Sequence, residues 1–460
     1  MKKTKILCTL GPASLKGDVL CRMTRAGMNA ARINTAFDDL DGYRSAIEAV
    51  RAVKDIPLLI DLKGPEIRLN CPQGGLVRKG GTIEAGFRRS DGPFFNRDVY
   101  GQLAVKDVLL LDKGRVRARV VGKGAGRVTL SVGADITLKE AMGVNVPAKQ
   151  LEIPTLSRKD VEAIGLAREL ACDFVALSFT RDARDVECLK RRLRGSEIGV
   201  IAKIENASGV ENAMPILAAC DGVMIARGDL GIEVPSERIP LIQKDLIARC
   251  NRMGKISIVA TEMLHSMVAN PQPTRAETSD VANAILDGAD AVMLSAESAV
   301  GKYPVEAVAA MSRIALEVEP HMMLRPLDED VHDKVSLAIS KAVAAIIGTV
   351  DVDKIVVATH SGYTAMLISN FRIRKDIIAI TDSPAVARKL QLVYAVQPVE
   401  HEYFRNKEKI VDIARYCLKA GLVSRRDLVL FIAGVYTKRP MTNLVELHRV
   451  SELMDFQTGV

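Results

Sequence analysis

The chain has 460 residues, of which 48% are hydrophobic and 26% charged, and its formal net charge is +8. This length and composition predict a globular protein of about three domains. No apolar run approaches the roughly 18 residues that a membrane span needs. The first apolar stretch is interrupted by Thr9, Gly11 and Pro12. We therefore expect a cytoplasmic protein with neither a signal peptide nor a membrane partner.

The basic charge allows either nucleic acid or small anions as partners. Aromatic residues make up only 4% of the chain and Trp is absent, so a base-stacking surface and a nucleic-acid partner are not expected. The eight cysteines are scattered and none forms a CxxC pair, which argues against a disulfide framework or a zinc site.

Eight short apolar runs recur along the chain, and helical patterns lie between most of them. The runs start at Lys5, Ala30, Pro57, Asp173, Gly199, Gly222, Ile256 and Ala291. Such continuous apolar runs are typical of parallel strands buried on both faces. One predicted helix starts at a Ser208 cap, and another stops at Gly288. The alternation favours an α/β fold built on a (β/α)₈ TIM barrel.

Two segments depart from this pattern and set the predicted domain boundaries. Residues 69–147 are rich in glycine and turns, which predicts a small inserted β-barrel lid domain over the carboxyl ends of the strands. Residues 323–460 contain further strand-turn-helix units, which predict a C-terminal open α/β regulatory domain. Residues 1–68 and 148–322 then form the catalytic barrel.

Polar and charged residues gather at the ends of the predicted barrel strands. These residues are Arg32, Asn34, Asp61, Lys63, Lys203, Glu205, Arg227, Asp229, Thr261 and Ser295. Side chains two apart on a strand point the same way, so Lys203 and Glu205 should project together into the barrel mouth. A structural ion pair would explain one such couple. Recurrence at the same end of several strands favours a functional site instead.

These residue types suit phosphoryl transfer. Glu205 and Asp229 are hard oxygen ligands appropriate for Mg²⁺ or Mn²⁺. Lys203 and Arg32 could neutralise a transferring phosphoryl group. Backbone N–H groups in the turn "ARGDLG" could receive a carboxylate at a helix start. Together they predict a metal-dependent site for a small phosphorylated carboxylic acid.

Long motifs in the same order resemble the pyruvate kinase family over nearly the whole chain. They include "TKILCTLGPAS", "DLKGPEIR", "AKIENASGV", "MIARGDLGIE", "ATEMLHSM" and "PTRAETSDVANAILDGADAVMLSAESAVGKYP". The resemblance implies the last step of glycolysis, in which phosphate passes from phosphoenolpyruvate to ADP and gives pyruvate and ATP. It also implies a homotetramer and allosteric control.

The resemblance further implies roles for individual residues. Lys203 and Arg32 would contact the phosphoryl group, and Glu205 and Asp229 would bind the divalent metal. Backbone groups of Gly228 and Asp229, together with Thr261, would hold the substrate carboxylate, and Ser295 would join the relay that protonates the enolate. The nucleotide would meet Asn34 and Arg68, and K⁺ would meet Asn34, Asp61 and the backbone of Leu62.

Several positions depart from the family pattern. Ala36 replaces a Ser that binds K⁺, Leu62 replaces a Thr, and Phe37 replaces a nucleotide-contacting His. Glu66 is nevertheless the residue type of K⁺-dependent members, so weakened K⁺ activation is expected. Met142 stands where a Lys often contacts nucleotide.

The C-terminal domain matches the family most loosely, but its loops predict a phosphorylated effector. The candidate phosphate ligands are Thr359, Ser361, Gly362, Tyr363, Thr364, Lys438 and Arg439. Hydroxyl and N–H groups at a helix start suit phosphate, although ordinary helix capping is the alternative. The effector could be fructose 1,6-bisphosphate, a sugar monophosphate or a nucleotide monophosphate.

Two other functions stay open from the sequence. A Mg²⁺-dependent lyase acting on oxo acids could use the same barrel and carboxylates, but it needs neither a lid nor Lys203. A catalytically weakened metabolite sensor, or an RNA-binding protein with a second role, would fit the altered nucleotide contacts.

Overall fold

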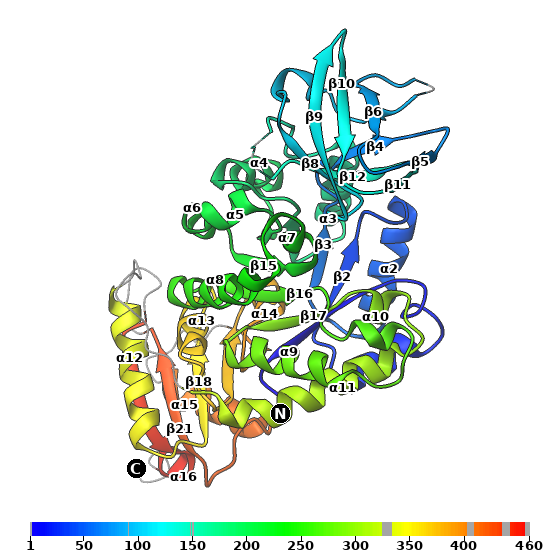
Figure 1. The fold of residues 1–460 in the computed structure, drawn as a ribbon. Helices are drawn as coiled ribbons and strands as arrows, with labels where there is room; N and C mark the ends of the chain where they lie inside the picture. The colour runs from blue at the N-terminus through cyan, green and yellow to red at the C-terminus, as the bar shows by residue number, and fades with distance from the viewer. Residues whose placement is uncertain are drawn as a thin grey trace.

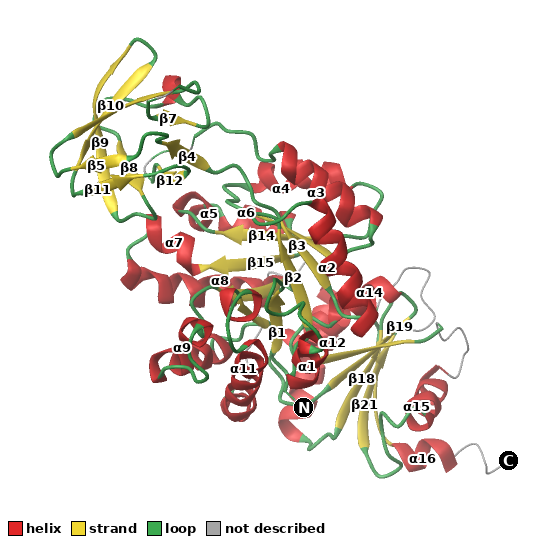
Figure 2. Cartoon of the chain, turned by 90° about the vertical axis from the view of Figure 1, so that its right-hand side faces the viewer, coloured by secondary structure: helices red, strands yellow, loops and turns green. Residues whose placement is uncertain are grey.

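The computed structural model describes residues 2–90, 92–147, 149, 151–323, 334–402, 409–434 and 442–455. A central barrel carries a smaller β structure at one end and an α/β sheet at the other, as two perpendicular views show (Figures 1 and 2). Within the described ranges, no helix is both long and apolar enough to cross a membrane.

The central barrel is a closed ring of eight parallel strands, which confirms the predicted fold class. In spatial order the strands are β1 (Lys5–Thr9), β17 (Ala291–Leu294), β16 (Ile256–Ala260), β15 (Gly222–Ala226), β14 (Gly199–Ile204), β13 (Phe174–Leu177), β3 (Leu58–Asp61) and β2 (Ala30–Asn34). Each of them contains part of one of the eight apolar runs. Nearly every residue in them is buried, as expected for strands enclosed on both faces.

Helices surround the barrel and connect its strands. They are α1 (Val19–Ala26), α2 (Leu40–Val53), α3 (Arg158–Glu169), α4 (Ala183–Leu193), α5 (Ala207–Glu211), α6 (Ala213–Ala219), α7 (Arg227–Glu233), α8 (Ile239–Met253), α9 (Arg275–Leu286), α10 (Ala296–Ala299) and α11 (Pro304–Val318), with 3₁₀ turns η2 (Ser236–Arg238), η3 (His265–Val268) and η4 (Glu319–His321).

The predicted cap at Ser208 is wrong. The Asn206 side chain accepts the Gly209 N–H at 2.7 Å, so α5 begins at Ala207 and Ser208 lies inside it. Asn and Ser are both good caps, and the one that reaches the third helical N–H sets the start. The predicted stop of α9 at Gly288 is close to the observed end, and Gly288 has a positive φ of 84° that favours glycine.

The inserted lid is a second closed β structure, and its long hairpin reaches furthest from the barrel (Figure 1). Its seven-stranded ring runs β10 (Arg127–Val132), β6 (Thr82–Gly86), β7 (Phe94–Phe95), β4 (Ile67–Asn70), β12 (Met142–Asn145), β8 (Val108–Leu111) and β9 (Val116–Gly124). A separate pair joins β5 (Gly75–Val77) to β11 (Ile136–Leu138), and η1 (Tyr100–Gln102) precedes β8. The lid has its own hydrophobic core.

The C-terminal part is an open five-stranded sheet with helices, as predicted. Its strands lie in the order β20 (Val396–Glu400), β19 (Ile377–Thr381), β18 (Lys354–Ala358), β21 (Leu428–Ala433) and β22 (Leu444–Arg449), and β22 is antiparallel to β21. Its helices are α12 (Lys334–Thr349), α13 (Tyr363–Asn370), α14 (Pro384–Leu390), α15 (Lys409–Lys419) and α16 (Val450–Asp455). One hydrophobic core runs from the barrel into this sheet.

A fully buried arginine joins the barrel to the C-terminal sheet. The Arg372 guanidinium lies 3.1 Å from the Asp290 carboxylate, donates to the Gly288 carbonyl at 2.8 Å and reaches the Asn251 side chain at 2.5 Å. Both charged side chains are at most 1% exposed. Asp290 precedes β17, so this ion pair lies at the end of the barrel opposite the mouth.

Candidate active site

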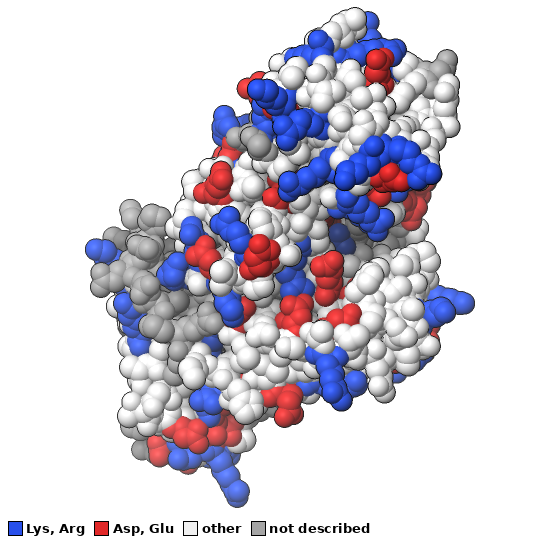
Figure 3. All heavy atoms as spheres, in the orientation of Figure 1, with Lys and Arg blue, Asp and Glu red and all other residues white. Residues whose placement is uncertain are grey.

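A cleft of about 320 Å³ separates the barrel mouth from the lid. Its walls include Arg68 and Lys113 from the lid, and Asn206, Asp229 and Glu233 from the barrel. Figure 3 shows Lys and Arg side chains gathered on the lid, several of them above this cleft. An anion entering the cleft would therefore meet cations on the lid side.

Lys203 lies at the centre of a buried charge cluster at the barrel mouth. Its Nζ is 2.9 Å from Glu205 Oε1 and 3.1 Å from Asp61 Oδ1, and it donates to Ser178 Oγ at 2.7 Å. Burial lowers the pKa of Lys203, but the two carboxylates more than offset this and raise the pKa above its ordinary value. Lys203 is therefore a cation at neutral pH. As predicted, the side chains of Lys203 and Glu205 project to the same side of β14, where they form an ion pair.

Arg32 forms the second cationic part of this cluster. Its Nε donates to Asp61 Oδ2 at 2.7 Å, and its Nη1 donates to Thr9 Oγ1 at 2.7 Å. Burial would raise the pKa of Asp61, but Lys203 and Arg32 outweigh it and hold this pKa below its ordinary value. Asp61 therefore stays ionised and orients both cations, which a carboxylate accepting several charged donors does well.

Two further carboxyl groups, those of Glu205 and Asp229, have pKa values that are raised rather than lowered. Burial raises the pKa of Glu205 despite Lys203, and the nearby charge of Asp229 raises it further. Burial also raises the pKa of Asp229. Among the described residues, no group of three or more acidic, His or Cys side chains is placed to hold a metal ion. Two hard carboxylates beside an open cleft fit Mg²⁺, which takes few protein ligands and completes its shell with water and substrate oxygens.

The start of α7 and the end of β16 meet beside this cluster. The Gly228 N–H, predicted to receive a substrate carboxylate, donates to Thr261 Oγ1 at 2.8 Å. Thr261 itself has φ = 67°, a left-handed conformation that is unusual for a β-branched residue. Arg227 holds it by donating from Nη2 to the Thr261 carbonyl at 2.7 Å. Strain held in place by neighbours in this way is typical of functional sites.

Ser295 follows β17 at the same end of the barrel. Its Oγ is buried and has no hydrogen-bond partner within the described part of the chain. An orphaned buried hydroxyl is costly and calls for an explanation. A proton-relay role of the kind predicted for Ser295 would provide one.

The predicted monovalent-cation ligands also lie together, but each is already engaged. Asn34 Oδ1 accepts the Ala36 N–H at 3.1 Å, and the Leu62 carbonyl accepts Ser178 Oγ at 2.6 Å. Glu66 is paired with Arg68, the residue predicted to contact nucleotide phosphates, whose Nε donates to it at 2.9 Å. This guanidinium places a positive charge beside Glu66.

The predicted effector loop lies between β18 and α13 in the C-terminal sheet. Thr359 Oγ1 accepts the Gly362 N–H at 3.0 Å, and Ser361 Oγ accepts the Tyr363 N–H at 3.4 Å. The N-cap residue of α13 is Gly362, which has no side-chain cap, so neither hydroxyl is the helix cap that the capping alternative expected. Thr364 contacts Thr442 through their hydroxyls at 2.5 Å. Lys438 and Arg439 lie outside the described residues.

Three contributors to the site were not predicted. Thr9 holds Arg32, Ser178 holds Lys203, and the Phe179 N–H donates to Glu205 Oε2 at 2.8 Å. Thr9 ends β1 and Ser178 directly follows β13, so the strand-end rule could have found both. The Phe179 contact uses backbone and has no signal in residue type.

Comparison with known protein families identifies the family to which this chain belongs. The family "Pyruvate kinase, barrel domain" matches residues 1–308, and "Pyruvate kinase, alpha/beta domain" matches residues 337–448. The chain is 39% identical to the pyruvate kinase of Geobacillus stearothermophilus, over 100% of this chain and 82% of that protein. This chain belongs to the pyruvate kinase family.

Other pyruvate kinases agree with this assignment. The Bacillus licheniformis protein is 38% identical, again over 100% of this chain and 82% of its own length. The crystal structure of a pyruvate kinase from Cryptosporidium parvum superposes with a TM-score of 0.89 at 30% identity, and the match covers 98% of this chain and 96% of that one.

Two departures from the pyruvate kinase pattern can be located in the structure. Phe37 is 72% exposed on the loop after β2, so its ring is free to meet a ligand. Met142 is 2% exposed and packs in the lid core beside the cleft. Neither offers the charge or hydrogen bond that the family residue would supply.

Proposed function

We propose that this protein transfers the phosphoryl group of phosphoenolpyruvate to ADP and produces pyruvate and ATP. The observation that carries the proposal is the buried cluster of Arg32 and Lys203 with Glu205 and Asp229 at the barrel mouth. It supplies positive charge for a phosphoryl group and carboxylates for a divalent metal. Family membership supports the same reaction.

Each residue has a proposed task in this reaction. Lys203 and Arg32 bind and neutralise the phosphoryl oxygens. The Gly228 and Asp229 N–H groups receive the substrate carboxylate once the Thr261 hydroxyl rotates away, and Thr261 then bonds to it as well. Ser295 passes a proton toward the enolate carbon.

Glu205 and Asp229 would hold Mg²⁺ or Mn²⁺, which would neutralise phosphoryl charge when bound. Arg68 would leave Glu66 to bind nucleotide phosphates, with Asn34 nearby. The lid would exclude water and so protect the phosphoryl group from hydrolysis.

A coupled assay tests this function directly. ATP should form only when phosphoenolpyruvate, ADP and Mg²⁺ are all present. Pyruvate release that does not depend on ADP, without ATP, would refute the proposal and favour a lyase.

We further propose that K⁺ activates weakly through Asn34, Asp61 and the Leu62 carbonyl. Ala36 contributes no hydroxyl, and Arg68 balances the charge of Glu66 as long as no nucleotide is bound. Turnover should rise modestly when K⁺ replaces a bulky organic cation at constant ionic strength. Equal turnover in the two salts would reject this site.

The proposal also includes regulation and assembly. A phosphorylated metabolite would bind the loop from Thr359 to Thr364 together with Lys438 and Arg439, in a cytoplasmic homotetramer. The cysteines are all free thiols, as expected in a reducing compartment. Titration of sugar and nucleotide phosphates at subsaturating phosphoenolpyruvate tests the effector, and light scattering tests the oligomer.

A further inference from the structure

The loop after β13, residues 178–182, contacts the catalytic cluster through two successive residues. Ser178 Oγ accepts Lys203 Nζ at 2.7 Å and donates to the Leu62 carbonyl at 2.6 Å. The Phe179 N–H donates to Glu205 Oε2 at 2.8 Å. Phe179 has φ = 54°, a strained conformation for an aromatic residue. The loop is therefore held in one shape that orients the lysine and the carboxylate.

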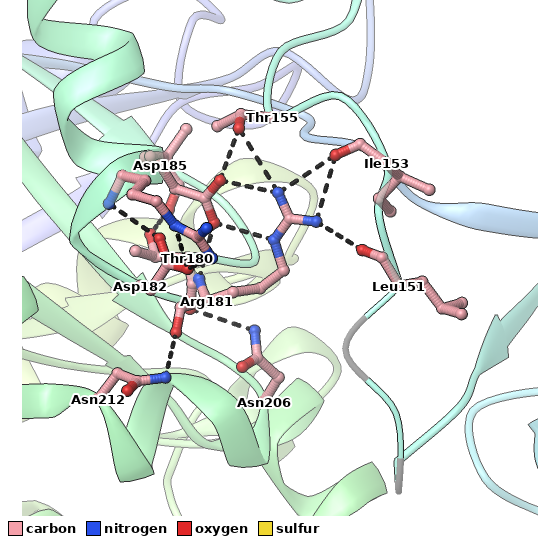
Figure 4. Close-up of polar contacts among 11 residues, drawn as sticks. Leu151, Ile153, Thr155, Thr180, Arg181, Asp182, Asp185, Asn206 and Asn212 are labelled. Atoms are coloured by element: carbon pink, nitrogen blue, oxygen red, sulfur yellow. Dashed lines mark hydrogen bonds and ion pairs between the residues drawn. The ribbon is translucent and has the colours of Figure 1, made fainter. Parts of the chain in front are cut away.

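Two residues further on, Arg181 of the same loop binds the segment that returns from the lid to the barrel, residues 151–155 (Figure 4). The Arg181 guanidinium points toward this segment and donates from Nη1 to the carbonyls of Leu151 at 2.9 Å and Ile153 at 3.2 Å. The same guanidinium binds both oxygens of Asp185, at 2.9 and 2.7 Å. Thr155 Oγ1 also donates to Asp185, at 2.6 Å. Arg181, Asp185 and residues 151–155 thus form one hydrogen-bonded group, which we call the clamp.

The charged groups of the clamp are largely shielded from solvent and remain ionised. The side chain of Arg181 is 17% exposed and that of Asp185 7%. Burial would raise the pKa of Asp185, but hydrogen bonds from Arg181 and Thr155 outweigh it and hold this pKa below its ordinary value. Lysine could not replace this arginine, because a single ammonium cannot span two carbonyls and a carboxylate with a planar fork.

The barrel supports the loop from the other side. Asn206 Nδ2 donates to the Thr180 carbonyl at 3.3 Å, and Asn212 Nδ2 donates to the Arg181 carbonyl at 3.0 Å (Figure 4). The chain leaving for the lid is tied down separately, where the Gly64 N–H donates to Asp160 at 3.2 Å. Both connections of the lid therefore start from fixed points on the barrel.

We propose that Arg181 is a positioning residue that fixes the returning connection of the lid to the loop that orients Lys203 and Glu205. Any movement of the lid then pivots about a connection whose position relative to Lys203 and Glu205 is fixed. A loosened clamp would leave the lid attached but placed imprecisely over the cleft. The catalytic consequences rest on the proposed function, whereas the clamp itself does not.

The test compares Arg181→Lys with a matched control, Arg184→Lys. Arg184 is three residues away and also pairs with an aspartate, Asp182, but its side chain is 86% exposed and is not placed in the site. Hydrogen exchange of the amides within residues 151–155 (Pro154 has none), chiefly the hydrogen-bonded N–H groups of Glu152 and Ile153, should accelerate by roughly 10- to 100-fold in R181K when measured without substrates. The control should exchange like the wild type.

Kinetics provide the second readout. R181K should raise KM for ADP and the fraction of phosphoenolpyruvate lost to hydrolysis, whereas Mn²⁺ binding should be unchanged, because the lid is misplaced and the metal ligands are not. An arginine that only stabilised the fold would not alter the fraction of phosphoenolpyruvate that is hydrolysed.

Each outcome decides a separate statement. Unchanged exchange at residues 151–155 overturns the clamp. Faster exchange with wild-type ADP kinetics and hydrolysis overturns the positioning role. Absence of ATP formation by the wild type overturns the proposed function, and the exchange result still decides the clamp. If R181K does not fold, Thr155→Val removes one hydroxyl from the clamp and should accelerate exchange in the same direction. Unchanged exchange in T155V would then count against the clamp.

Discussion

Replacing Lys203 by methionine tests the central assignment of the site. The substitution keeps a long, unbranched side chain in the barrel mouth and removes the charge that lies 2.9 Å from Glu205 and 3.1 Å from Asp61. Asp61 keeps its bond to Arg32 at 2.7 Å, and Glu205 keeps the Phe179 N–H. We therefore expect the K203M variant to fold.

The loss of activity should be large. A single cation that stabilises a transferring phosphoryl group contributes about 10³- to 10⁵-fold in rate, or about 4–7 kcal/mol. Metal binding should respond differently, because loss of Lys203 removes a positive charge that competes for Glu205. Mn²⁺ affinity at about pH 8 should stay within about tenfold of the wild type, equivalent to about 1.4 kcal/mol.

Three measurements check this expectation: coupled ATP formation, titration with Mn²⁺ and circular dichroism. Lys255→Met is the control, because Lys255 lies at the opposite end of the barrel, where its Nζ donates to the Cys220 carbonyl at 2.6 Å. K255M should retain normal turnover. More than about a tenth of wild-type kcat in folded K203M, a loss of under 1.4 kcal/mol, would refute the assignment of Lys203.

Three further predictions follow from buried polar groups. Because burial raises the pKa of Glu205 and Asp229, a proton must leave before Mg²⁺ binds at lower pH, so affinity should increase with pH. Calorimetry in buffers of different ionisation enthalpy should detect proton release on binding as the pH is lowered, and binding without any proton release would contradict this. Ser295→Ala should raise the unfolding free energy by about 1 kcal/mol, because its buried Oγ has no described partner, yet lower kcat about 100-fold; unchanged kcat would exclude a relay role. Arg372→Met should cost about 3 kcal/mol in urea unfolding, because Asp290 loses its buried cation, and a loss under about 1 kcal/mol would contradict that.

The barrel could be predicted because its physical signal is local. Each buried strand is a continuous apolar run, and parallel strands bring their carboxyl ends to one edge. The period of two then places Lys203 and Glu205 on one side. The same rule applied to the first and fourth strands would have added Thr9 and Ser178.

The remaining details depend on which neighbour satisfies each polar group. Asn206 and Ser208 are both adequate helix caps, and only the fold decides between them. The Gly228 N–H is covered by Thr261 from another strand. The Arg181 clamp uses carbonyls 28 and 30 residues away, which have no residue-type signature. Such contacts follow from tertiary structure and cannot be read from spacing.

The loop of residues 178–182 also predicts where this chain tolerates changes of length during evolution. Ser178, Phe179 and Arg181 act in fixed succession, so one inserted or deleted residue would displace the lysine contact, the carboxylate contact or the clamp. The turn at Ala125 and Gly126 joins β9 to β10 at the tip of the hairpin that reaches away from the barrel, and neither residue lines the cleft (Figure 1). Insertions and deletions among natural relatives should therefore be common at that turn and rare in the loop after β13.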